Sequence, residues 1–392
     1  MKPSATTRLV RKINQSAILD LVRTSGPISR TEIAHRLHTS LPTVMRIIDD
    51  LVAENLVVED GTFEVNGGRP RALLAFNGQA HTVIGLDLGG TQMVGTVADL
   101  NGQVLKEIAL PWTSEGAEKN FELVCRLLQD LIDADAPMGT QLLGVGIGVP
   151  GVTHPDKGMA VLVPSLEWVN FPLRERLRER FDLLTLIEND VNLAALGEYG
   201  FGGQAGAESL VCITVGTGVG AGIVLDRKIH LGHRFAAGEI GYILPGVAAL
   251  GVKSGDYGPL ESLASGTALL RRAAAILREM HDPRADQLFT LQDLYAAVKA
   301  GEPWAQSLVD EMTDYLAMAV ASVSALIDPE VIVLGGGITV YADEMIPLIM
   351  KRLDGVMMYP PRLVKSTLGY RAAVMGAILK VLDAVTEHVS VA

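Results

Sequence analysis

Three glycine clusters, each at the end of a strand-like apolar run, constrain the fold of this chain more than any other feature. They read DLGGT at 87–91, GTGVG at 216–220 and LGGG at 334–337. Glycine lets backbone N–H groups approach a phosphate without an intervening side chain. From about residue 80 the strand-like runs alternate with helical ones, which indicates layered α/β architecture. A dinucleotide-binding fingerprint is disfavoured, because Ala221 stands at its third glycine position and no acidic residue follows at the expected distance.

Composition and the terminal residues indicate a soluble, multidomain protein. The chain has 392 residues, of which 48% are hydrophobic and 20% charged, as expected for two or three globular domains. The N-terminus lacks the apolar run of a signal peptide, and the longest apolar stretch, 315–327, is too short to cross a bilayer. Cys125 and Cys212 are far apart in apolar contexts and predict no disulfide. We therefore expect a cytoplasmic protein with no membrane partner.

The N-terminal region differs in charge from the rest. Residues 1–46 contain eight Lys or Arg and two acidic residues, a net charge of +6, whereas the whole chain carries −12. Two helix-like segments joined by HTS at 38–40 predict a helix-turn-helix, with Ser29 and Glu32 as a capping box at the first of them. The pair DG at 60–61 predicts a hairpin wing. These features favour a DNA-binding head.

The second helix of this head is expected to begin near Ser40, which would cap it, and to enter a major groove. Arginines of the segment GGRPR are expected to reach a minor groove. The expected DNA-binding residues are Ser40, Pro42, Thr43, Arg46, Arg69 and Arg71. The expected apolar faces are Ile13, Ala17 and Leu21, with Ile18 and Val22 beside them, in the first helix, and Leu41, Val44, Ile48 and Leu51 in the reading helix. A helical dimerisation module with a hairpin remains the alternative.

The three glycine clusters in this order resemble the actin-like, RNase H-like sugar kinase fold, in which two α/β lobes clasp ATP. More narrowly, ITVGTGVGAGIVLDRKIHLGHRFAAGEIG at 213–241 resembles the ROK family of repressors, open reading frames and kinases. With the head in front, the chain is similar to the ROK transcriptional repressors of bacteria. The resemblance implies an α/β two-lobed fold preceded by an all-α winged helix-turn-helix head. The expected parts are a head over 1–76, a first lobe over 80–190 with 372–392, and a second lobe over 191–371 with the sugar site and dimerisation surface.

The resemblance also implies site residues. Sugar contacts fall on Asn189, Asp190, Glu239, Tyr242 and Glu261, and Asp190 would be the catalytic general base if the chain is a kinase. Nucleotide contacts fall on Asp87, Gly89, Gly90, Thr91, Gly216, Thr217, Gly218, Gly335, Gly336 and Gly337. In VPSLEWVNFPL, Trp168 would either stack on a sugar ring or belong to the core, and Ser165 and Asn170 are weaker candidates. Asn189 and Asp190 are also expected to cap the helix that follows them.

The chain departs from the family at its zinc loop. Tyr242 replaces the family's zinc-binding histidine, and Val252, Ser254 and Pro259 replace its three cysteines. Zinc needs imidazole or thiolate ligands in tetrahedral number, so no zinc is expected. The loop would instead be held by packing through Leu250, Val252, Tyr257 and Leu260. No cofactor is required, although the glycine turns are compatible with ATP-Mg²⁺.

The implied function is a DNA-binding repressor of sugar metabolism genes. A sugar between the two lobes would control it, and it would bind operator DNA as a homodimer or homotetramer. The alternative is an ATP-dependent sugar kinase, resembling ROK glucokinases, that carries a DNA-binding head; any kinase activity is expected to be weak or vestigial. The sequence leaves open the sugar, the operator, the direction of the sugar's effect, and whether a sugar is phosphorylated.

Overall fold

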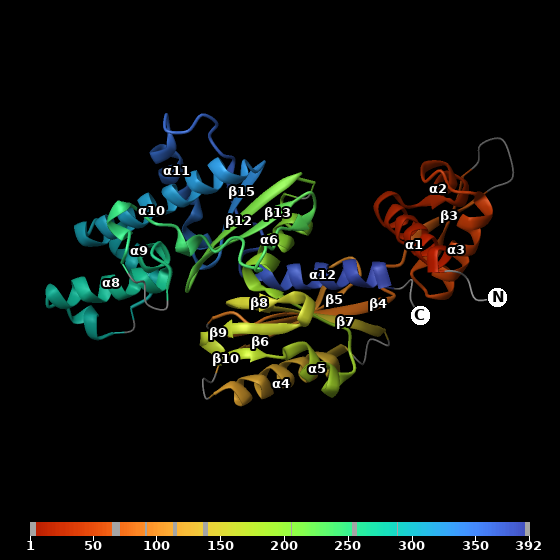
Figure 1. The fold of residues 1–392 in the computed structure, drawn as a ribbon, viewed down its shortest axis with the longest axis horizontal. Coiled ribbons are helices and arrows are strands. Elements are labelled where there is room, and N and C mark those ends of the chain that lie inside the picture. Colours follow the sequence, from red (N-terminus) through yellow and green to blue (C-terminus); the bar gives the residue numbers. More distant parts are fainter. Residues whose placement is uncertain are drawn as a thin grey trace.

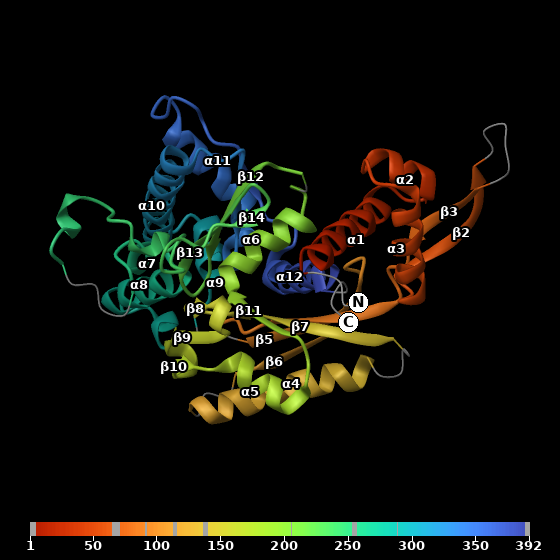
Figure 2. The same cartoon turned by 45° about the vertical axis from the view of Figure 1, so that its right-hand side comes forward.

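A computed structural model describes residues 5–64, 71–90, 92–112, 116–135, 140–204, 206–252, 257–287 and 289–388. A small head and two α/β lobes follow one another along the chain (Figure 1). In these described ranges, no helix combines the length and the apolar character that a membrane crossing needs. The head lies at one end of the molecule, against the first lobe (Figures 1 and 2).

The head combines three helices with a small antiparallel sheet. Its elements are α1 (Ala5–Ser25), β1 (Ile28–Ser29), α2 (Arg30–Arg36), α3 (Leu41–Ala53), β2 (Val57–Glu64) and β3 (Arg71–Phe76), with strand order β1-β3-β2. The paired strands β2 and β3 form a wing, as predicted. The predicted hairpin turn at Asp60 and Gly61 is wrong, because both residues lie inside β2, where the register of the pairing shifts. The hydroxyl of Ser29 accepts the N–H of Glu32 at 3.2 Å, so the Ser29 half of the predicted capping box is confirmed. The carboxylate of Glu32 accepts the guanidinium N–H of Arg36 at 2.7 Å instead of the backbone N–H of Ser29.

The predicted apolar faces of α1 and α3 are each partly wrong. In α1, Ile18 and Val22 are buried as predicted, together with Leu19, whereas Ile13 is 58% exposed. In α3 the buried residues are Val44, Ile47, Ile48 and Leu51, and Leu41 is 41% exposed. Leu41 is the first residue of α3, and helical spacing alone does not show whether the end of a helix is covered.

The first lobe is built on a five-stranded sheet of order β11-β7-β4-β5-β6. β4, β7 and β11 are parallel, and β4, β5 and β6 are antiparallel. A small sheet of order β10-β9-β8 adjoins it. A buried apolar cluster joins the large sheet to α4 and α5. The bounds are β4 (His81–Asp87), β5 (Gln92–Asp99), β6 (Val104–Pro111), α4 (Ala117–Asp135), β7 (Gln141–Val149), β8 (Val152–His154), β9 (Met159–Val163), β10 (Trp168–Phe171), α5 (Leu173–Phe181) and β11 (Thr185–Asn189).

The second lobe repeats this topology. Its sheet has the order β14-β13-β12-β15-β16, again with an antiparallel meander on one side and parallel strands on the other. The bounds are α6 (Asp190–Gly200), β12 (Ser209–Val215), β13 (Val219–Leu225), β14 (Lys228–Ile229), α7 (Glu261–Ala264), α8 (Gly266–Glu279), α9 (Leu291–Lys299), α10 (Pro303–Ile327), β15 (Val331–Gly335), α11 (Ala342–Leu353) and β16 (Leu363–Lys365). The last helix, α12 (Ala372–His388), returns to pack on the sheet of the first lobe. Short 3-10 turns η4 (Ile240–Tyr242) and η7 (Gly337–Tyr341) follow β14 and β15.

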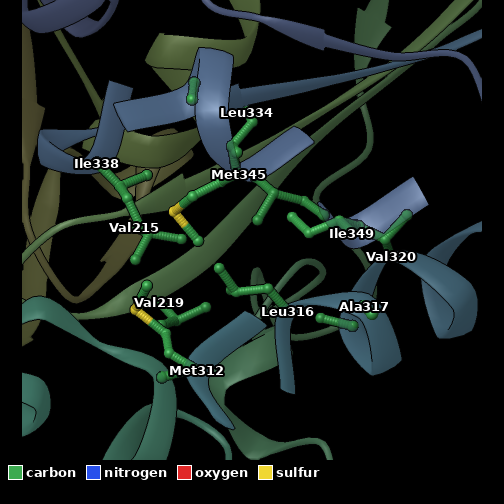
Figure 3. Close-up of a cluster of buried hydrophobic side chains, with 14 of the residues drawn as sticks. Val215, Val219, Met312, Leu316, Ala317, Val320, Leu334, Ile338, Met345 and Ile349 are labelled. Atoms are coloured by element: carbon green, nitrogen blue, oxygen red, sulfur yellow. The ribbon is translucent and has the colours of Figure 1, made fainter. Parts of the chain in front are cut away.

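A buried apolar cluster supports the glycine turns of the second lobe (Figure 3). Val215 and Val219 flank the turn 216–218, and Leu334 and Ile338 flank the turn 335–337. All four side chains pack in one cluster with α10 and α11, including Met312. The positions of both turns are therefore set by close packing of the core beneath them.

Helix α12 lies between the first sheet and α6 and runs toward the head (Figure 1). Its backbone approaches both neighbours closely. A Cβ at Gly376 would lie 1.8 Å from the carbonyl oxygen of Leu193 in α6, and a Cβ at Gly85 in β4 would lie 2.5 Å from that of Val374. These glycines are required because any side chain would separate the elements.

The head rests on the C-terminal end of α12. Leu19 and Leu56 of the head meet Leu382 and Val385 of α12 in one buried cluster, which includes the first-lobe residue Leu100. The joint encloses a cavity of about 10 Å³, lined by Leu19, Arg23, Leu56, Phe76, Leu100, Leu382 and Val385. The head is thus attached through a small apolar contact.

Candidate functional site

The turn between β11 and α6 carries the first two predicted sugar-binding residues. The side-chain oxygen of Asn189 accepts the N–H of Asn192 at 3.0 Å, so the predicted cap of α6 is confirmed. Its amide donates to the carbonyl of Gly151 at 3.0 Å and to Oδ1 of Asp190 at 3.1 Å. Asn189 therefore ties the turn to the loop before β8 and also orients the carboxylate of Asp190.

Asp190 is partly buried, and its Oδ1 also accepts the N–H of Val191 at 2.9 Å. Burial raises the pKa of Asp190 to about 6, the N–H groups that it accepts lower this pKa, and the negative charge of Glu239 raises it. A carboxyl group with a pKa near 6 exchanges protons close to neutral pH. It would therefore suit either a hydrogen bond to a sugar hydroxyl or the work of a general base.

Glu239 and Glu261 extend this acidic site from the second lobe. Burial, and then repulsion from Glu261, raise the pKa of Glu239. The two carboxylate oxygens of Glu261 accept the N–H groups of Val219 and Gly258, each at 3.3 Å. The structure therefore brings Asp190, Glu239 and Glu261 together, as the resemblance implies, whereas their contact with a sugar stays a prediction.

Tyr242 follows in η4 and is 60% exposed. Within the loop that replaces the zinc site, Leu260 is buried, whereas Leu250 is 62% and Val252 is 65% exposed. Tyr257 is 48% exposed. The prediction that all four apolar residues pack the loop down is therefore right for Leu260 and wrong for the other three. Ser254 lies outside the described residues.

The part of the chain that the structure describes contains no cluster of side chains that could bind a metal ion. No three His, Cys, Asp or Glu side chains there are arranged to hold an ion. Cys125 and Cys212 are free and buried, in agreement with the expected lack of a disulfide. The absence of zinc remains a prediction from the missing ligands.

The three glycine turns converge beside Asp190. A Cβ at Gly90 would lie 2.9 Å from Oγ1 of Thr217, and a Cβ at Gly337 would lie 3.9 Å from the Cα of Gly216. Gly336 has φ of +82°, and a Cβ there would lie 2.6 Å from the carbonyl oxygen of Val215. The first glycine turn therefore lies against the second, and the second lies against the third. The predicted nucleotide-binding residues on these turns are Gly89, Gly90, Gly216, Thr217, Gly218, Gly335, Gly336 and Gly337. Thr91 lies outside the described residues.

Asp87, at the end of β4, lies beside the first glycine turn and Asp190. A Cβ at Gly148 would lie 3.5 Å from both Oδ1 of Asp87 and the Cα of Asp190. Burial, and then repulsion from Asp190, raise the pKa of Asp87 well above its usual range. Its Oδ1 is buried and accepts no hydrogen bond from the described residues. A bound water or a hydrated cation would satisfy this oxygen.

Sequence reasoning missed the groups that hold these turns. The indole of Trp112 donates to the carbonyl of Gly89 at 2.6 Å and so fixes the first glycine turn. Glu188 accepts the N–H of Asn189 at 3.0 Å and pairs with Lys380 at 2.8 Å. No local motif pointed to the Trp112–Gly89 or the Glu188–Lys380 contact, because these join residues 23 and 192 positions apart along the chain.

Trp168 is part of the core. Its side chain is 0% exposed, its indole N–H donates to the carbonyl of Ala117 at 3.0 Å, and its ring stacks on Phe171. The alternative in which Trp168 stacks on a sugar is therefore wrong, because no face of the ring is open. Ser165 and Asn170 are exposed.

The head presents part of α3 to solvent. Pro42 and Arg46 are exposed, and Thr43 is partly exposed. Ser40 precedes α3, but its side chain makes no capping bond to the backbone, so that expectation is wrong; its hydroxyl pairs with that of Thr43 at 2.8 Å instead. Arg69 lies outside the described residues, and Arg71 begins β3. DNA contact by these residues stays a prediction.

Comparison with known proteins separates the head from the body. Residues 83–384 match the model of the ROK family, and residues 12–58 match that of the MarR family. The chain is 30% identical to the xylose repressor of Caldicellulosiruptor bescii over 96% of both chains. A ROK family glucokinase from Streptomyces griseus, solved with glucose and AMPPNP, is 28% identical with a TM-score of 0.66, over 76% of this chain and 98% of the glucokinase.

A solved ROK family transcriptional regulator, a homologue of the E. coli MLC protein, shares the whole fold. It covers 97% of this chain and 98% of its own, with a TM-score of 0.84 and 24% identity. The duplicated sheet topology, the converging glycine turns and the match over residues 83–384 agree with one another. The chain belongs to the ROK family, with a MarR-type winged helix-turn-helix head in front of its two lobes.

Proposed function

We propose that this chain is a transcriptional repressor of sugar metabolism genes whose affinity for operator DNA is controlled by a bound sugar. The observation that carries the proposal is the presence in one chain of a winged helix-turn-helix head and a ROK body. Similarity to the xylose repressor over 96% of both chains supports it, because that similarity includes the head as well as the body.

The sugar is proposed to bind at Asn189, Asp190, Glu239 and Glu261, with Tyr242 at the edge. Ionised carboxylates accept hydrogen bonds from hydroxyl groups, and the amide of Asn189 can both donate and accept. These groups come from the β11–α6 turn and from the second lobe. A sugar held by both parts would favour one arrangement of the lobes over another, which is the requirement for a ligand-controlled switch.

The head is proposed to read DNA with the exposed part of α3 and with the wing. One reading helix contacts one half-site, so we propose that the protein acts as a homodimer or a higher oligomer on a palindromic operator. Arg46 is the exposed cation on α3 that this arrangement would bring to the base edges.

The alternative is a sugar kinase with a DNA-binding head. The raised pKa of Asp190, about 6, and the converging glycine turns favour it. ATP would supply the phosphoryl group, the backbone N–H groups of the turns would hold its phosphates, and Asp190 would take the proton of the sugar hydroxyl. A coupled assay of ATP consumption over a panel of monosaccharides separates the two functions. Turnover at about 10 per second that is lost in Asp190→Ala would make the kinase function primary.

The decisive experiment for the repressor function measures DNA binding with and without sugar. A duplex is selected from a random pool by the full-length protein, and its dissociation constant is measured with D-xylose, D-glucose or N-acetyl-D-glucosamine. We expect one sugar to change this constant, and Asp190→Ala to abolish that change, because the lost hydrogen bonds weaken sugar binding about tenfold or more.

Asp130→Ala is the matched control, because Asp130 is an exposed carboxylate on α4. It should retain the wild-type response. If calorimetry gave the same sugar affinity for Asp190→Ala as for wild type, this result would contradict the proposed sugar site. Failure of the wild-type protein to select any DNA would contradict the repressor function itself.

A further inference from the structure

We infer that Lys380 is a positioning residue of the sugar-binding turn, and that it links this turn through Glu188 and α12 to the DNA-binding head. The inference rests on the proposed function and assigns its coupling route. Nζ of Lys380 lies 2.8 Å from Oε2 of Glu188, whose side chain is only 1% exposed. The side chain of Lys380 is 28% exposed, so the pair is shielded from water to a large extent.

Glu188 holds the turn at its base. It is the residue before Asn189 on β11, and its other oxygen, Oε1, accepts the N–H of Asn189 at 3.0 Å and the side-chain amide of Asn192 at 3.1 Å. A buried carboxylate keeps its position only while its partners remain, because an unpaired charge in this environment is strongly unfavourable. The geometry of the turn therefore depends on a lysine that belongs to α12.

Helix α12 is suited to transmit a displacement because its backbone touches its neighbours directly. A Cβ at Gly197 of α6 would lie 2.1 Å from the carbonyl oxygen of Ala372, and a Cβ at Gly146 of β7 would lie 2.3 Å from that of Ala377. Backbone-to-backbone contacts contain no flexible side chain that could absorb a small movement. α12 and α6 therefore move together, or one slides along the other.

The far end of α12 reaches the head. Leu382 and Val385 follow Lys380 within the next turn and a half, about 7.5 Å along the helix axis. They pack in one cluster with Leu19 and Leu56 of the head, around the small cavity of the joint. A change at Glu188 when sugar engages Asn189 and Asp190 would thus reach the head through one continuous helix (Figure 2).

The test compares three full-length variants with wild type. Lys380→Met removes the charge but keeps a long unbranched side chain, and Lys380→Arg keeps the charge. Lys365→Met is the matched control, because Lys365 pairs with Asp343 at 2.6 Å on the surface of the second lobe. For each protein, the dissociation constant of the selected duplex is measured without sugar and with saturating D-xylose, D-glucose or N-acetyl-D-glucosamine, whichever sugar the wild type responds to.

The ratio of the two constants is the coupling factor. We expect about 5- to 150-fold for wild type and Lys365→Met, the usual range for allosteric coupling, and a factor within about twofold of unity for Lys380→Met. Lys380→Arg should restore most of the coupling. Sugar affinity, measured with and without DNA, must change by the same factor in each protein. General damage to the fold would weaken both binding reactions, but it would leave their ratio unchanged.

Wild-type coupling in Lys380→Met overturns the inference while leaving the proposed function intact. Failure of wild type to respond to any of the three sugars counts against the proposed function instead. If Lys380→Met does not fold, Lys380→Met combined with Glu188→Gln replaces it, because this pair leaves no buried charge unpaired. Undiminished coupling in that double variant would equally refute the role of the ion pair.

Discussion

At the scale of single residues, Asp190 lowers the stability of the folded protein at neutral pH, because burial disfavours its ionised form. Its folded-state pKa of about 6 lies above its ordinary value of 3.8, so the native protein binds the proton of Asp190 more tightly than the unfolded chain does. The contribution of protonated Asp190 to the free energy of unfolding is therefore fully present below about pH 4, and it is lost as the pH rises through about 6. The same sign applies to Asp87 and Glu239, whose pKa values are also raised.

Asp190→Asn should therefore stabilise the protein at pH 7.5 by up to about 3 kcal/mol. The oxygen of the new amide can still accept the N–H groups of Val191 and Asn189, so the cap geometry is retained. Urea unfolding of both proteins from pH 4.5 to 8 checks this expectation. The difference should be small at pH 4.5, grow toward pH 6 and then level off; a difference that is independent of pH would contradict the raised pKa.

Arg46 is the test residue for DNA recognition. Arg46→Ala should weaken binding of the selected duplex by about 1–3 kcal/mol if the guanidinium reads a base edge, and should relax preference at one base pair. Arg126→Ala is the control, because this arginine is 72% exposed on α4 and distant from the head in sequence. Fluorescence anisotropy with a set of single-base variants measures both effects. An equal loss on every duplex would assign Arg46 to the phosphate backbone instead.

The residues that the sequence predicted well are those in which the local motif sets the geometry. Asn189 caps α6 because its position before a helix determines that role, and the glycine turns meet because each ends a central strand. Trp168 could not be assigned in advance, because burial depends on Ala117 and Phe171 around it. The Glu188–Lys380 pair joins residues 192 positions apart, and neither residue stands in a motif.

At the scale of elements, glycine lets α6 and α12 approach each other closely, within a buried apolar cluster that the two helices share. Leu193 and Gly376 bring the two helices together so closely that even a methyl group at Gly376 would overlap a carbonyl oxygen. Glycine inside a helix costs about 1 kcal/mol relative to alanine, so its use at this position implies a compensating gain from close approach.

Gly376→Ala should consequently destabilise the protein, although alanine is the better helix former. We expect a loss of about 1–3 kcal/mol, as for other overpacked core positions. Gly200→Ala is the comparison, because a Cβ there would meet Cδ2 of Leu379 at 2.2 Å, and this side-chain end can rotate away. Thermal unfolding of both variants measures the difference. If Gly200→Ala proved the more damaging change, the backbone contact would not be the controlling feature.

At the scale of the whole molecule, the two-lobed architecture could be predicted because the three glycine clusters, in their order along the chain, resemble those of a known two-lobed fold. Both sheets place a three-stranded antiparallel meander beside two parallel strands, and each lobe shows a glycine turn after its first strand. The seating of the head on α12 could not be predicted, because apolar residues such as Leu382 and Val385 are equally compatible with burial inside a lobe. The periodic pattern of a helix predicts an apolar face and does not name the element that covers it.

The contact between head and body predicts which residue types related proteins carry at three positions, depending on whether they have a head. Leu100, Leu382 and Val385 are buried here, with Leu19 and Leu56 of the head packed in the same cluster. In a ROK protein without a head, apolar residues kept at these three positions would lack the cover that the head provides and would form an exposed apolar patch. Members without a head should therefore carry polar or charged residues at these positions, or cover the patch with a second subunit. A lineage that gained a head would be recognised by the change of these three positions to apolar residues, and a lineage that lost one by the reverse.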